Sequence, residues 1–158
     1  MHHVHTHAPE RDTHDMSSEL DAYDLGWLLF DVAGRGDLER VTRALDQGAD
    51  VRWRCINSFT PLYIAARGGH EAVVRLLLDR KADVNAKTYD TNVTPLCIAA
   101  RNGRESIVRL LLDREADINA ADHENRTPLH EAARNAFEPI VRLLLERGAD
   151  TTIVSVCQ

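Results

Sequence analysis

The chain has 158 residues, the length of a single domain, and a net charge of −6. Six of its 25 acidic residues and one of its 19 basic residues lie in the first 24 positions, which leaves nineteen acids against eighteen bases. Because the remainder is nearly neutral, it lacks the basic stripe that nucleic acid requires, and we expect no such partner. No apolar run approaches about eighteen residues and no charged-then-apolar leader is present, so we expect neither a membrane span nor secretion.

Residues 1–20 contain few apolar side chains. Their histidines are His2, His3, His5, His7 and His14. This composition predicts a disordered, acidic tail, because the segment cannot bury enough apolar surface to offset the entropy of ordering. Clustered imidazoles can bind copper, nickel or zinc, but no second shell fixes these as ligands, so we favour a solvated tail and expect no metal or other cofactor.

One unit recurs along the rest of the chain. The heptad at 60–66, TPLYIAA, returns at 94–100 as TPLCIAA and at 127–133 as TPLHEAA. An apolar run follows each copy, at 73–78, 107–112 and 140–145, and an Ala-Asp pair closes each unit. A divergent copy at 27–33 precedes them and has no Thr-Pro. A period of about 33 residues predicts a stacked solenoid rather than a globular enzyme core.

Each unit predicts two antiparallel helices. Threonine before proline is typical of a helix start, because the hydroxyl accepts from a free N–H and proline lacks the donor that would stay unpaired. The first helices are therefore expected to begin at Pro61, Pro95 and Pro128. Gly69 and Gly103 then permit a positive φ at the turn, whereas Ala136 in the last unit should strain or shift it.

The second helix of each unit carries Val or Ile and three leucines at helical spacing. No unit can bury this stripe alone, so neighbouring units must supply the core, with the second and third leucines inside it. Charges on the opposite side, such as Glu105, Arg109 and Asp113, predict a solvated convex face without a function.

These residues resemble the ankyrin repeat, whose pattern is Thr-Pro-Leu-His-x-Ala-Ala, a Gly-His turn, a second helix ending in Leu-Leu, and Gly-Ala-Asp-Val-Asn-Ala. The resemblance covers roughly residues 25–153. It implies an all-α solenoid of four ankyrin repeats, at about 24–57, 58–91, 92–124 and 125–154. These make a repeat domain at 21–154, with a tail at 155–158, and the first repeat is expected to cap the array.

The resemblance also implies a function, since ankyrin arrays typically bind another protein through a concave face of β-turn fingers and first-helix edges. Register places the candidate partner-binding residues at Trp53, Arg54, Ile56, Asn57, Phe59, Tyr63, Arg67, Tyr89, Asp90, Thr91, Val93, Arg101, Asn102, His123, Glu124, Arg126 and Arg134. Residues at Ser58, Asn92 and Asn125 stand where family fingers usually have glycine.

Aromatic and arginine residues are the best candidates for contact energy on this face. We expect Tyr89 to be exposed, whereas Trp53 and Phe59 either face the partner or cover the gap between fingers. The row of Arg67, Arg101 and Arg134 would favour an acidic or carboxylate-bearing partner, although this Ala-Ala-Arg pattern is common in the family without such a role.

The alternative is a small-molecule or catalytic pocket on the aromatic fingers, with Asp90, Asp122, His123 or Glu124 as acid or base. No nucleophile elbow, His-Glu-x-x-His or phosphate-cradling glycine loop is present, so we expect no enzyme. His130 stands at the family's histidine position and is expected to support the turn.

The cysteines, Cys55, Cys97 and Cys157, are odd in number and have no Cys-x-x-Cys spacing. This pattern suits a reducing compartment, cytoplasmic or nuclear, and predicts no disulfide framework. The last repeat keeps the internal apolar pattern and is followed by Ile153, Val154 and Val156. We expect this end to fold back as a lid; self-association through it, or a longer array, is the alternative.

Overall fold

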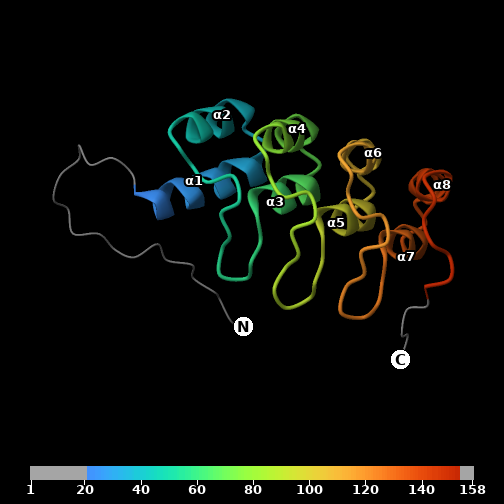
Figure 1. Ribbon diagram of the computed structural model, residues 1–158. Helices are drawn as coiled ribbons and strands as arrows, with labels where there is room; N and C mark the ends of the chain where they lie inside the picture. The colour runs from blue at the N-terminus through green and yellow to red at the C-terminus, as the bar shows by residue number, and fades with distance from the viewer. Residues whose placement is uncertain (1–20, 154–158) are drawn as a thin grey trace, which may run out of the picture.

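The structure is a computed structural model that describes residues 21–153. Its helices are α1 (Ala22–Arg35), α2 (Leu38–Asp46), α3 (Pro61–Gly68), α4 (Glu71–Asp79), α5 (Pro95–Arg101), α6 (Glu105–Asp113), α7 (Pro128–Arg134) and α8 (Glu138–Glu146). The odd-numbered helices form one row and the even-numbered helices a second, with three long loops hanging from the first row (Figure 1). This arrangement confirms the predicted all-α solenoid, whereas the expected tails at 1–20 and 155–158 lie outside the described residues.

The Thr-Pro pairs start the first helices as predicted. The hydroxyls of Thr60, Thr94 and Thr127 each accept a hydrogen bond from the N–H three residues later, at the start of α3, α5 and α7. Helix α1 has no such pair, and the Asp21 carboxylate caps it instead by accepting from the Asp24 N–H at 2.9 Å. A side-chain cap of this kind contributes about 1 kcal/mol to helix stability.

The turn between the two helices of a repeat needs one residue with positive φ. Gly69 and Gly103 adopt φ values of 81° and 71°, and Ala136 adopts 57°. The turn in the last repeat does not shift, because the Phe137 N–H still donates to the Ala132 carbonyl at 2.9 Å, as in the earlier repeats. Ala136 therefore holds a left-handed conformation that costs a residue with a Cβ about 1 kcal/mol.

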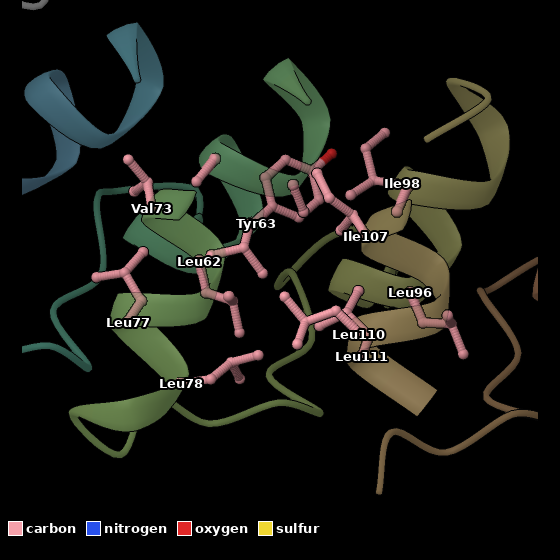
Figure 2. Close-up of a cluster of buried hydrophobic side chains, with 14 of the residues drawn as sticks. Leu62, Tyr63, Val73, Leu77, Leu78, Leu96, Ile98, Ile107, Leu110 and Leu111 are labelled. Carbon is pink, nitrogen blue, oxygen red and sulfur yellow. The ribbon is translucent and has the colours of Figure 1, made fainter. Parts of the chain in front are cut away.

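The core lies between the repeats (Figure 2). Each run buries its second leucine fully, at Leu77, Leu111 and Leu144, against the neighbouring helix pair. The third leucine of the later repeats is less buried: Leu112 is partly buried against the core, whereas the prediction is wrong for Leu145, which is 46% exposed. Leu145 stays exposed because no described helix pair packs beyond α8.

Ion pairs along the even-numbered helices tie neighbouring repeats together. The predicted i,i+4 pairs form between Glu71 and Arg75 (3.0 Å) and between Glu105 and Arg109 (3.3 Å). The aspartates that end these helices pair instead with the next repeat, Asp79 with Arg114 (2.8 Å) and Asp113 with Arg147 (2.9 Å). Each exposed pair contributes about 0.2 to 1 kcal/mol at most.

Two further predictions concern a membrane span and the C-terminal lid. Within residues 21–153, no helix is long and apolar enough to cross a bilayer. Val154 and Val156, which would form the fold-back lid, lie outside the described residues. The lid and self-association through this end stay predictions.

Candidate binding surface

Three loops and the adjacent edges of α3, α5 and α7 form one surface, which we call the finger face. The loops span residues 53–59, 87–93 and 121–126 and run side by side (Figure 1). Each turns at a residue in the left-handed region, with φ of 59° at Ser58, 55° at Asn92 and 58° at Asn125. Ser58, Asn92 and Asn125 thus adopt the positive φ that glycine usually supplies at these positions in the family.

Hydrogen bonds between neighbouring loops hold the finger face in register. The Arg54 guanidinium donates to the carbonyl of Lys87 at 3.0 Å, which joins the first loop to the second. The His123 N–H donates to the Thr91 carbonyl at 3.1 Å, which joins the third loop to the second. Thr91 also shares a hydroxyl hydrogen bond with Thr88 at 2.9 Å. Part of the hydrogen-bonding capacity of Arg54, Thr91 and His123 therefore serves to hold the loops in place.

The outer parts of the loops present apolar and polar side chains to solvent. Ile56 is 90% exposed and Tyr89 is 85% exposed, which confirms the expectation for Tyr89. Asn57, Asp90 and Glu124 are also exposed. Large apolar side chains held out on a fixed backbone lose little entropy when a partner covers them.

Two of the candidate residues are mostly buried, which corrects the expectation that the Val93 side chain and the ring of Tyr63 are open to a partner. Val93 is only 3% exposed, because it closes the second loop against the core. Tyr63 is 8% exposed, and its ring lies among the core side chains of Figure 2. A residue counted as a finger by register can thus still point inward.

Trp53 and Phe59 are half-buried and pack against the array itself. The Trp53 ring lies 6.2 Å from the ring of Trp27 and 6.0 Å from that of Phe30, both on α1. Phe59 stacks on Tyr63 with ring centroids 4.9 Å apart. Both residues therefore cover a gap within the array, which was one of the two alternatives, rather than point wholly toward a partner. Each side chain stays partly exposed.

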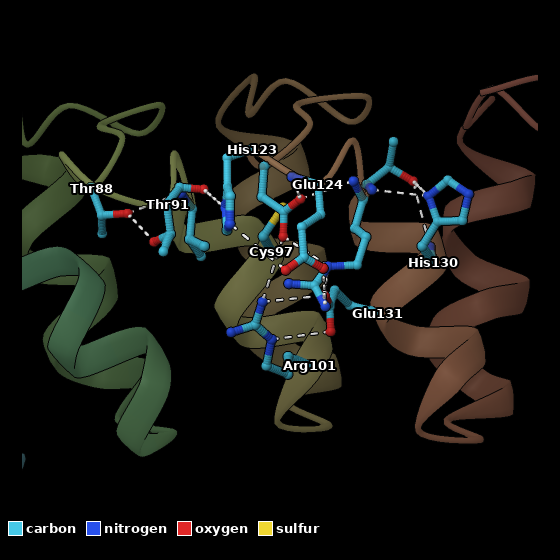
Figure 3. Close-up of polar contacts among 12 residues, drawn as sticks. Thr88, Thr91, Cys97, Arg101, His123, Glu124, His130 and Glu131 are labelled. Carbon is cyan, nitrogen blue, oxygen red and sulfur yellow. Dashed lines mark hydrogen bonds and ion pairs between the residues drawn. The ribbon is translucent and has the colours of Figure 1, made fainter. Parts of the chain in front are cut away.

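An ionic cluster of two buried carboxylates and two partly exposed arginines joins α5, α7 and the third loop (Figure 3). Arg101 makes a two-pronged hydrogen bond to Glu131, at 3.0 and 3.1 Å, and Glu131 is 3% exposed. Arg126 contacts the same carboxylate at 3.3 Å. The hydrogen bond to Glu131 raises the pKa of Arg101, so this guanidinium is permanently charged and already paired.

Asp122 completes the cluster as an anchor for the third loop. Its carboxylate accepts from the backbone N–H groups of Glu124 and Arg126, both at 2.9 Å, and from the Arg126 side chain at 3.0 Å. Burial acts to raise the pKa of Asp122, but these hydrogen bonds and the Arg126 charge lower it overall. An ionised carboxylate with its lone pairs occupied is a poor acid or base, so Asp122 fits a structural role.

Sequence reasoning missed Glu131 and did not foresee the role of Cys97. Glu131 occupies the heptad position that holds Ile64 and Ile98 in the preceding repeats, and that difference was a usable signal. The Cys97 thiol donates to the Ala120 carbonyl at 3.4 Å, and burial raises the pKa of this thiol to about 11.

His130 supports the turn, as expected. Its Nδ1 accepts from the Thr127 N–H at 2.9 Å and completes a capping box at the start of α7.

Other candidate residues on the helix edges keep their side chains exposed. Arg67 and Arg134 are exposed at the ends of α3 and α7, and neither side chain makes a hydrogen bond or ion pair to another described residue. Asn102 is exposed too, although its amide donates to the Ile98 carbonyl at 2.8 Å. Of the three arginines in the predicted row, only Arg101 therefore has an ion-pair partner among the described residues.

Depressions of several sizes lie on the described part of the chain, and its acidic, histidine and cysteine side chains form no metal-binding group. Within residues 21–153, no three His, Cys, Asp or Glu residues gather in a way that could hold a metal ion. A depression of about 220 Å3 is lined by Arg52 and Arg54, by Thr60 and Leu62 at the start of α3, and by Asp83 ahead of the second loop, among others. Larger, shallow depressions, of about 700 and 560 Å3, lie against α2 and between α2 and α4.

Comparison with known protein families matches most of the described chain. The model for ankyrin repeats in three copies matches residues 87–155, and the single ankyrin repeat model matches residues 57–89. The two matches overlap at their junction and together include three of the four helix pairs.

Several curated proteins are similar to parts of the chain. Serine/threonine-protein kinase 12 of Arabidopsis thaliana is 38% identical over 82 residues, which are 50% of this chain and 18% of the kinase. Delta-latroinsectotoxin-Lt1a of Latrodectus tredecimguttatus is 46% identical over 63 residues, 39% of this chain and 5% of the toxin. Human ankyrin repeat and KH domain-containing protein 1 is 48% identical over 52 residues, 33% of this chain and 2% of that protein. The chain thus spans less than a fifth of these relatives.

Proposed function

Because this chain belongs to the ankyrin-repeat family, whose repeats generally serve as protein-interaction modules, we propose that it is a non-catalytic binding module that holds a protein partner on its finger face. The observation that carries this proposal is the pair of exposed apolar side chains, Ile56 and Tyr89, on loops that Arg54 and His123 hold in register. A pre-ordered loop that presents an aromatic side chain is typical of a binding hot spot.

The charges on the finger face support a partner that carries acidic groups. Arg67 and Arg134 offer guanidinium groups without an ion pair among the described residues, and an arginine can bind a carboxylate through two hydrogen bonds. The pocket alternative receives less support, because Asp122 and Glu124 are already paired with Arg126. We place the protein in the cytoplasm or nucleus, a proposal that the unpaired thiols of Cys55 and Cys97 support.

Affinity capture with matched variants tests the proposal. The immobilised chain captures proteins from an extract of its source organism, and the affinity of each captured protein is then measured. Tyr89→Ala should weaken binding by about 30-fold, which corresponds to the 2 kcal/mol of a hot spot. Arg109→Ala, in an exposed ion pair on α6, is the control and should bind like the unchanged chain. Equal losses for the two variants would contradict binding at the finger face.

A further inference from the structure

Three arginines occupy equivalent places at the ends of α3, α5 and α7, but the residue that faces them from the next repeat differs. Arg101 meets Glu131, which binds it at 3.0 and 3.1 Å. The residue equivalent to Glu131 in the preceding repeat is Ile98, which is buried and has no charge. Arg67 therefore lacks an internal counter-ion, whereas Arg101, at the equivalent position of the next repeat, has one.

Tyr63 places a second donor beside Arg67. The two residues are four apart on α3, so their side chains lie on the same face of the helix. The ring is buried and stacks on Phe59, yet its hydroxyl makes no hydrogen bond to another described residue. Every buried side-chain oxygen or nitrogen among the described residues has a hydrogen-bond partner, so the Tyr63 hydroxyl reaches the surface.

The electrostatic surroundings keep this hydroxyl a donor. Burial raises the pKa of Tyr63, and the positive charges of Arg67 and Arg101 offset only part of that increase. The phenol is therefore protonated at neutral pH. Because Glu131 neutralises Arg101, Arg67 carries the unbalanced positive charge close to the hydroxyl.

We propose that the Tyr63 hydroxyl and the Arg67 guanidinium together bind a side-chain carboxylate, from an aspartate or glutamate, of the protein partner. The inference rests on the proposed function and specifies the chemistry of one contact within it. The carboxylate accepts one hydrogen bond from the phenol and one or two from the guanidinium, and each such bond is charge-assisted. A carboxylate matches these two donors better than an amide, which carries no charge, or a cation, which accepts from neither.

The charge of Asp90 opposes the binding of a carboxylate at this site. It lies on the second loop, near enough that its charge acts to raise the pKa of Tyr63, and its carboxylate accepts from the Thr91 hydroxyl at 3.4 Å. Its negative charge repels an incoming carboxylate and so weakens the binding of the partner's acid. Replacing Asp90 by asparagine should therefore strengthen the binding of an acidic peptide at least twofold.

Peptide selection against the whole chain tests the proposed site. The probe is a displayed library of random twelve-residue peptides, and the enriched peptides are synthesised and titrated by calorimetry. We expect them to share one aspartate or glutamate. Changing that acid to its amide, or Arg67→Ala, should each weaken binding at least tenfold. Tyr63→Phe, which keeps the buried ring and removes only the hydroxyl, should weaken it at least threefold.

The combined changes identify the contact itself. In the Arg67→Ala background, the acid-to-amide change should cost less than in the unchanged chain, because only the Tyr63 hydroxyl still binds the acid. The carboxylate site would be overturned by peptides that lose affinity with Tyr89→Ala but share no acid, or whose affinity does not change with Arg67→Ala. Such peptides would still support binding at the finger face. Peptides weakened by Arg109→Ala and indifferent to Tyr89→Ala would overturn the proposed function as well.

Discussion

Whether a side chain on the finger face is paired or unpaired depends on residues of the next repeat, about 30 positions away in the sequence. Arg67, Arg101 and Arg134 follow the same Ala-Ala pair, and their positions could be predicted from the repeat alone. Their availability could not, because it depends on whether the next repeat supplies Glu131 or an isoleucine. Arg101 is thus mainly part of the internal packing, whereas the exposed Arg67 side chain has no ion-pair partner among the described residues.

Arg101→Ala should reduce the free energy of unfolding by about 1 to 2 kcal/mol, since it removes charge-assisted hydrogen bonds to a buried carboxylate. The loss is smaller than for an isolated buried pair, because Arg126 still contacts Glu131. In a Glu131→Ile background, the same change should cost less than about 0.5 kcal/mol. Urea unfolding of the four proteins measures the coupling, and equal costs in both backgrounds would mean that the ion pair contributes nothing.

Helix pairs were the most predictable level of the structure. Local chemistry fixed their starts, because threonine caps the first turn and proline needs no donor there. The depth of each leucine was less predictable, since burial depends on the repeat that packs against it. Leu111 in α6 has α8 beyond it, whereas no described helix lies beyond Leu145.

Leu111→Ala should therefore lower the free energy of unfolding by about 2 to 5 kcal/mol through the cavity that it leaves. Leu145→Ala makes the same chemical change at a half-exposed position and should cost less than about 1 kcal/mol. Urea melts followed by circular dichroism compare the two. A similar cost for both variants would show that the inter-repeat core is not where the structure places it.

The whole molecule is a stack in which neighbouring repeats contact one another, so the three loops inherit their spacing from the helix pairs. The repeat period therefore predicted the finger face as a surface, and it predicted the exposure of Tyr89 correctly. It could not place Trp53, because that ring packs on the α1 aromatic residues of the divergent first repeat. Nor could it separate Val93, turned inward, from its exposed loop neighbours.

Hydrogen–deuterium exchange of the chain with and without its captured partner tests the central claim, that the finger face is the binding surface. Binding should slow exchange at 53–59, 87–93 and 121–126, because the partner covers the loop amides and opposes their local opening. Exchange along the outer sides of α4 and α6 should stay unchanged within error. Slowed exchange confined to α4 and α6, with the three loops unaffected, would contradict the account and place the partner on the even-numbered helices.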